Sequence, residues 1–185
     1  MRTVIVTEFI SVDGVIEAPG GEEGYKHTGW TFDLEPDPTM YDFKLEEARE
    51  VEALLLGRRT YEGFAGAWPE REGEFADKFN SMPKYVVSST LTDPAWNNTT
   101  VIGFDQVAAL REGDGGPIQV AGSGTLARGL HKAGLVDQWN LMVFPVVLGS
   151  GARLFPTDAE DKQKVELVDH RAYANGVQLQ VFRTA

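Results

Sequence analysis

The amino-acid sequence predicts an α/β fold, in which helices flank a mainly parallel β-sheet and an antiparallel hairpin ends the chain. Up to Val136, short apolar runs rich in β-branched residues alternate with helical patterns, as they do in parallel βα units. Beyond Val136, two longer β-rich stretches surround the dipeptide Asn175-Gly176, and Asn-Gly between such stretches is a strong hairpin signal.

The N-terminal half supplies the predicted centre of the sheet. Thr3–Ser11 is apolar with few breaks, which indicates a strand that is buried on both faces. Val12–Pro38 is rich in Gly, Pro and Glu and is expected to form a long irregular loop, a type of segment that is uncommon unless it is functional. Thr39–Glu52 has a helical pattern, and Ala53–Leu56 follows as a short buried strand.

The remaining elements have similar signals. Further short strands are predicted at Lys84–Ser88, Thr99–Ile102 and Pro117–Ala121, and helices around Phe104–Arg111 and Thr125–Ala133. The last strands are predicted within Trp139–Leu148 and Val165–Thr184, joined by turns at Gly149-Ser150-Gly151 and at Asn175-Gly176.

Composition limits the class of protein. A chain of 185 residues with 42% hydrophobic and 24% charged residues is expected to form one domain over residues 1–185. The absence of cysteine excludes thiolate chemistry and fits a cytoplasmic location. A net charge of -11 disfavours nucleic acid and anionic membranes as partners, so an anionic ligand needs local positive groups.

The first such group follows the strand that ends at Leu56. Gly57, Arg58, Arg59 and Thr60 stand where a helix should begin, and helix N termini with nearby arginines bind phosphate. The alternative is that the two arginines are ordinary exposed residues of a turn.

Two more turns follow predicted strands. Ser88, Ser89 and Thr90 lie where a parallel sheet forms its ligand crevice, although hydroxyl groups also serve as ordinary turn formers there. The segment Ala121 to Leu126, which comprises Ala121, Gly122, Ser123, Gly124, Thr125 and Leu126, links a strand to a helix through glycines, as pyrophosphate cradles do. With Ala127 it also fits a Rossmann fingerprint, but no later parallel strand ends in an acidic residue for a ribose.

Five motifs, in this order, span nearly the whole chain. They are Ser11-Val12-Asp13-Gly14, Gly57-Arg58-Arg59-Thr60-Tyr61-Glu62, Ser88-Ser89, Ala121-Gly122-Ser123-Gly124, and Pro145 to Gly151 with Leu154-Phe155. With them the chain resembles the dihydrofolate-reductase-like superfamily. Within that superfamily it is most similar to proteins related to the C-terminal reductase domain of the bacterial bifunctional riboflavin-biosynthesis deaminase-reductase.

The resemblance implies a dihydrofolate-reductase-like sheet that binds NADPH. It implies that the nicotinamide lies near Val12, Gly14 and Ile16, that the phosphates lie near Gly57 to Thr60 and the Ala121 to Leu126 turn, and that the 2′-phosphate lies near Ser88, Ser89 and Thr90. The substrate cleft then lies under the long loop, with Trp30, Phe32, Tyr41 and Asp42 as candidate contacts.

The resemblance leaves the substrate open. Related riboflavin-pathway reductases usually carry Glu where this chain has Ala121. The leading hypothesis is an NADPH-dependent reductase that transfers a hydride to a small pterin-like or pyrimidine-like heterocycle. The alternatives are the 5-amino-6-(5-phosphoribosylamino)uracil reductase of riboflavin biosynthesis and a non-catalytic NADPH-binding or regulatory protein.

Hydride transfer does not require a catalytic acid with a signature motif, because the cofactor supplies most of its chemistry. Asp13 is the candidate for orienting the substrate or donating a proton, and the alternative is an Asp-Gly turn. On the helix that follows the long loop, Asp42 and Glu46 could face the cleft or form a solvated face.

No metal site is expected, since His27, His131 and His170 are isolated in the sequence. Asp158, Glu160 and Asp161 indicate a solvated loop. Apolar strands near Trp139 to Val147 suggest a face covered by a second copy, as in a homodimer.

Overall fold

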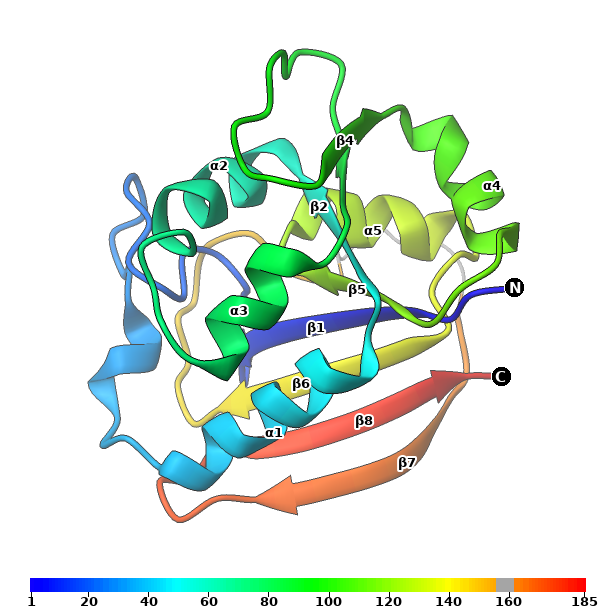
Figure 1. The fold of residues 1–185 in the computed structure, drawn as a ribbon. Coiled ribbons are helices and arrows are strands. Elements are labelled where there is room, and N and C mark those ends of the chain that lie inside the picture. The colour runs from blue at the N-terminus through cyan, green and yellow to red at the C-terminus, as the bar shows by residue number, and fades with distance from the viewer. Residues whose placement is uncertain (156–161) are drawn as a thin grey trace.

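The computed structural model describes residues 1–155 and 162–185, so the predicted loop at Asp158, Glu160 and Asp161 lies outside the described residues. Within them the strands form one eight-stranded sheet in the order β4-β3-β2-β5-β1-β6-β8-β7 (Figure 1). The strands are β1 (Val4–Ser11), β2 (Ala53–Gly57), β3 (Lys84–Val87), β4 (Thr99–Ile102), β5 (Ile118–Ala121), β6 (Gln138–Phe144), β7 (Val165–Ala172) and β8 (Gln178–Thr184). The helices are η1 (Trp30–Asp33), α1 (Pro38–Glu50), α2 (Arg58–Ala67), α3 (Glu74–Ser81), η2 (Phe104–Gln106), α4 (Val107–Glu112) and α5 (Gly124–Lys132).

The predicted fold class is confirmed. From β4 to β6, every pair of neighbouring strands runs parallel, whereas β8 runs antiparallel to both β6 and β7. Strand β1 lies between β5 and β6 with nearly all of its side chains buried, as its unbroken apolar sequence predicts. The turn at Asn175-Gly176 joins β7 to β8, and the φ of +89° at Gly176 explains why glycine stands there.

Helices cover both faces of the sheet (Figure 1). On one face, α1, α2 and α3 bury Ala48, Tyr61 and Phe79 against the sheet. On the opposite face, Val107 of α4 and Leu130 of α5 pack in a cluster with Val4 and Val6 of β1 and with Trp139. Alternate side chains of β1 therefore enter different cores.

The long loop between β1 and α1 is packed rather than loose. Trp30 is 2% exposed and its ring meets the Phe144 ring edge to face at 5.4 Å. Its indole Nε1 donates to Glu17 O at 2.8 Å, which fixes two parts of the loop to each other. Val15 and Leu179 share the same core cluster, so the loop forms part of the wall on the β6 and β8 side.

Three details differ from the sequence-based prediction. The strand predicted to reach Leu148 ends at Phe144, because Pro145 follows and has no N–H to continue the ladder. The segment at Gly149-Ser150-Gly151 does not join neighbouring strands, since β8 lies between β6 and β7. Helix α3 was not predicted. Among the described residues no helix is long and apolar enough to cross a membrane.

Candidate active site

Two helices begin side by side at the carboxyl edge of the sheet. Strand β2 leads through Gly57 into α2, and the neighbouring strand β5 leads through Ser123 into α5. The Gly57 N–H donates to Ser123 Oγ at 2.8 Å and joins the two turns directly. No side chain caps either helix, so their first N–H groups remain available to an anion.

The glycine-rich turn is held closely by its neighbours. Gly122 and Ser123 adopt φ values of +63° and +66°, in the left-handed region. A Cβ atom at Gly124 would lie 2.6 Å from Cδ1 of Ile16, which shows how tightly the long loop approaches the start of α5. The structure thus brings together three of the predicted segments: Gly57 to Thr60, Ala121 to Leu126, and the residues around Ile16.

The third predicted turn lies on the same edge. Val87 pairs in register with Gly57, so Ser88 and Gly57 leave the sheet at nearly the same level. Ser88 Oγ accepts hydrogen bonds from the backbone N–H groups of Thr90 and Leu91, which is a turn-forming role. The side chains of Ser89 and Thr90 are exposed.

Positive charge gathers near these turns. Arg58 pairs with Glu62 one helical turn along α2 at 2.9 Å, and Arg59 is exposed beside it. Two further arginines that sequence reasoning missed lie close by. Arg128 donates to Thr125 Oγ1 and to Arg153 O, and Arg153 pairs with Asp13 at 3.7 Å. In the sequence, only the helical spacing between Thr125 and Arg128 indicated that Arg128 lies near the glycine-rich turn.

The Asp13 carboxylate accepts three hydrogen bonds. The donors are Ser11 Oγ at 2.7 Å and the backbone N–H groups of Leu148 and Gly149 at 3.1 and 2.8 Å. Although partial desolvation opposes the shift, these hydrogen bonds lower the pKa of Asp13 to about 2. A carboxylate of this kind is an anchor for the segment after β6 and a poor proton donor at neutral pH.

The predicted substrate residues occupy different environments. Trp30 lies in the core with its polar atom engaged, so this conformation leaves it little surface for a ligand. Phe32 is 68% exposed and Tyr41 is 50% exposed, and Asp42 is exposed on α1. Glu46, the other carboxylate considered on this helix, pairs with Arg171 at 3.0 Å.

A buried polar chain connects α1 to the sheet, and sequence reasoning missed it because its members are far apart in the sequence. Lys44 donates to Thr7 Oγ1 and pairs with Glu47, and its Nζ lies over the Phe9 ring at 5.4 Å from the centroid. Glu47 also accepts from Asn140 Nδ2 at 2.6 Å. This cluster lies on the α1 face of β1, next to the long loop.

A second buried carboxyl group lies on the opposite face of β1. Glu8 is 5% exposed, and its Oε1 has no hydrogen-bond partner among the described residues. Burial raises the pKa of Glu8 to about 8, against the opposing charges of Lys44 and Arg128. Strongly shifted acids of this kind gather at functional sites.

Metal ligands do not converge within the described part of the chain: no group of three His, Cys, Asp or Glu residues could hold an ion. Of the three histidines, His131 packs edge to face against Trp139 at 5.5 Å between ring centroids. It belongs to the aromatic packing behind α5.

The sequence profile of the RibD C-terminal domain matches residues 2–179. The chain belongs to the RibD C-terminal domain family. Two relatives come from Bacillus subtilis (strain 168), both named as uncharacterized proteins. YyaP is 27% identical and the match covers 95% of this chain and 92% of YyaP, and YwjB is 26% identical with 98% of each chain covered.

Solved structures support the RibD C-terminal domain fold along the whole chain. A putative riboflavin biosynthesis protein from Shewanella sp. PV-4 superposes with a TM-score of 0.72 at 18% identity and 99% coverage of both chains. A pyrimidine reductase-like protein from Corynebacterium diphtheriae gives a TM-score of 0.64 at 14% identity, over 99% of this chain and 92% of the other. The fold predicted from the resemblance is therefore confirmed.

Proposed function

We propose that the protein is an NADPH-dependent reductase that transfers a hydride to a small pterin-like or pyrimidine-like heterocycle. One observation carries the proposal: two uncapped helix N termini meet at the carboxyl edge of a parallel sheet. The hydrogen bond from Gly57 N to Ser123 Oγ joins them. In a chain of net charge -11, this edge gathers Arg58, Arg59, Arg128 and Arg153. A pyrophosphate dianion matches this combination of N–H groups and guanidinium groups.

The residues present fit such a cofactor. Gly122 lies in the left-handed region, and Gly57, where a Cβ atom would lie 3.3 Å from Ser123, lets the two turns approach each other. Ser89 and Thr90, exposed at the end of β3, and Arg59 offer hydroxyl groups and a positive charge to a 2′-phosphate. We therefore expect preference for NADPH over NADH.

When bound, the reduced nicotinamide supplies the hydride, and the protein positions the two reactants and excludes water. The long loop, fixed through Trp30 and through Ile16 N to Ala152 O, forms the roof of that compartment. Asp13 acts as a positioning residue, because an anion with a pKa near 2 holds the segment after β6 in place. Lys44, beside Phe9 and Thr7, offers a positive charge to a substrate on the α1 side.

The direct test is titration of the purified protein with NADPH and with NADH, followed by nicotinamide fluorescence. Arg59→Ala should weaken NADPH binding about tenfold or more, the loss expected for one hydrogen-bonded charge. Arg49→Ala is the matched control, because Arg49 is an exposed arginine on α1 that pairs with Glu74. If neither cofactor binds to the wild-type protein, the proposal fails.

Membership in the RibD C-terminal domain family favours a second candidate, the 5-amino-6-(5-phosphoribosylamino)uracil reductase of riboflavin biosynthesis. Ala121 in place of the usual Glu argues against it. Supplying that pyrimidine and following NADPH absorbance separates the two. Tight NADPH binding without oxidation across a panel of pterins and pyrimidines would instead favour a non-catalytic NADPH-binding or regulatory protein.

We also propose that the protein is a homodimer. All eight residues of the edge strand β7 are exposed, and Val165 and Leu167 present apolar side chains, 38% and 50% exposed, from one face of it. An apolar edge of this kind is usually covered. Light scattering at micromolar concentration should give twice the chain mass, and Leu167→Lys should halve it. A monomeric wild-type protein would refute the proposal.

A further inference from the structure

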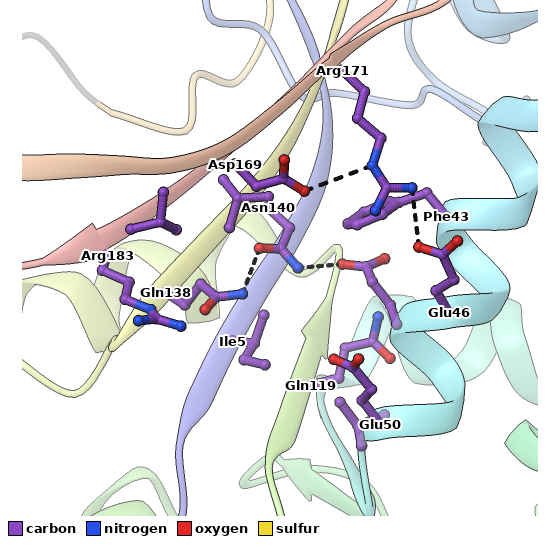
Figure 2. A pocket seen from close by; sticks show the side chains of 14 residues that line it. Ile5, Phe43, Glu46, Glu50, Gln119, Gln138, Asn140, Asp169, Arg171 and Arg183 are labelled. Atoms are coloured by element: carbon purple, nitrogen blue, oxygen red, sulfur yellow. Dashed lines mark hydrogen bonds and ion pairs between the residues drawn. The ribbon is translucent and has the colours of Figure 1, made fainter.

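A groove lies beneath α1, on the face of the sheet that this helix covers (Figure 2). Its volume of about 390 Å³ is within the range of small-molecule sites. The floor is formed by Ile5, Gln119, Gln138, Asn140 and Val181. Glu46, Glu47 and Glu50 form the α1 wall, and Asp169, Arg171 and Arg183 form the wall on β7 and β8.

The groove is distinct from the candidate active site. Ile5 pairs in register with both Gln119 and Gln138, whereas Thr7 pairs with Ala121 and Asn140 one layer nearer the carboxyl edge. Because side chains on one face recur every second residue, the part of the floor formed by Ile5, Gln119 and Gln138 lies one layer farther from the glycine-rich turns. The hydrogen-bonded cluster of Lys44, Thr7, Glu47 and Asn140 lies at the end of the groove nearest the carboxyl edge, where Glu47 and Asn140 are its last lining residues.

Gln119 is the residue in the groove that the fold does not explain. It is 2% exposed, it lies in the floor of the groove in Figure 2, and its Oε1 has no hydrogen-bond partner among the described residues. A buried amide without a partner costs roughly 1–3 kcal/mol. By contrast, Gln138, on the other side of Ile5, donates to Asn140, which in turn donates to Glu47. The floor therefore retains one amide that a ligand could satisfy.

As with the amides of the floor, some of the charged side chains on the two walls are paired and others are not. Arg171 pairs with Glu46 at 3.0 Å and with Asp169 at 3.6 Å, and Glu47 pairs with Lys44. Within residues 1–155 and 162–185, neither Glu50 nor Arg183 takes part in an ion pair. The groove thus presents an unused carboxylate on one wall and an unused guanidinium group on the other, with Ile5 and Val181 between them.

We propose that this groove binds a small zwitterion, with a guanidinium-type or amino group directed to Glu50 and Gln119 and a carboxylate directed to Arg183. Glutamate carboxylates accept the forked N–H groups of guanidinium, and Arg183 can bind a carboxylate in the same forked manner. The apolar floor residues suit a short methylene chain between the two ends. The proposal is independent of the reductase activity.

The test uses ω-guanidino acids of increasing length, namely guanidinoacetate, 3-guanidinopropionate and 4-guanidinobutyrate. Each is titrated into the isotopically labelled full chain while the side-chain amide signals of Gln119 and Gln138 are followed by NMR. One member of the series should shift the Gln119 signal saturably. Butylguanidinium, which lacks the carboxylate, and butyrate, which lacks the cation, should each bind at least tenfold more weakly than that member.

Variants locate the site. Arg183→Gln should weaken binding about tenfold or more, and so should Glu50→Gln, whereas Arg49→Gln on the outer side of α1 should leave the affinity unchanged. Arg183 and Glu50 are exposed, so these variants should fold. No shift of Gln119 at about 10 mM of any member, or equal affinity in Arg183→Gln and wild type, would overturn the proposal. Either result would leave the NADPH titration unaffected.

Discussion

Replacing Asp13 with Asn is expected to destabilise the protein by about 2 kcal/mol at neutral pH. The side chain is 20% exposed, and its carboxylate accepts three hydrogen bonds of 2.7 to 3.1 Å. Against partial desolvation, these bonds lower the pKa from the ordinary 3.8 to about 2, and one pKa unit corresponds to about 1.4 kcal/mol. Asn keeps the size of the side chain but turns an N–H₂ group toward a backbone N–H, so donors face each other.

The pH dependence follows from the sign of the shift. Because the pKa of Asp13 is lower in the folded state, its contribution is fully present above the unfolded-state value. It is lost as the pH falls through the folded-state value near 2. The stability difference between wild type and Asp13→Asn should therefore be constant between about pH 6 and 8 and should shrink below about pH 4.

Urea unfolding followed by tryptophan fluorescence at a series of pH values measures this difference. Asp33→Asn is the matched control, since Asp33 is exposed and its substitution should change stability by less than about 0.5 kcal/mol. A loss for Asp13→Asn that is equally large at about pH 3.5 and pH 7 would refute the reasoning, because the stabilisation would then not depend on the ionised carboxylate.

Two further predictions concern packing. Gly124→Ala should destabilise by only about 1 kcal/mol, because the atom that the new Cβ would meet at 2.6 Å is Ile16 Cδ1, the movable end of a side chain. Ile16→Val removes that atom, so denaturation of the double variant should show a coupling energy of about 1 kcal/mol, and strict additivity would argue against the contact. Lys84→Met should cost about 3 kcal/mol or more in the same assay, because the fully buried Lys84 Nζ donates to three backbone carbonyls, those of Asn80, Met82 and Asn97. A loss below about 1 kcal/mol would mean that water replaces the ammonium group.

Local signals in the sequence were enough to predict the central strand and the turns at the sheet edge. The unbroken apolar run of β1, Gly122 and Asn175-Gly176 each impose a conformation through sterics or burial within a few residues. Parallel strand order then brings the turns together, since the carboxyl ends of parallel strands meet at one edge. That much of the site therefore followed from the sequence.

What the sequence did not disclose depends on contacts between distant segments. Helix α3 begins after Gly73 without a capping side chain, and its Phe75 and Phe79 contact Trp68 at the end of α2. The pairing of Lys44 with Thr7 crosses from α1 to β1, and the contact of Asp13 with Arg153 spans most of the chain. No periodic pattern encodes such pairs, because each partner alone looks like an ordinary surface residue.

The hydrogen bond between Gly57 N and Ser123 Oγ has an evolutionary consequence. A side chain at position 57 would bring its Cβ within 3.3 Å of Ser123 Cβ and Oγ, so the two turns cannot both enlarge. Relatives that carry a larger residue at position 57 should carry glycine at position 123, because alanine would keep the Cβ atom of that contact. Lineages that keep glycine at 57 are free to keep the serine hydroxyl that accepts its N–H. The two positions should therefore change together, although 66 residues separate them.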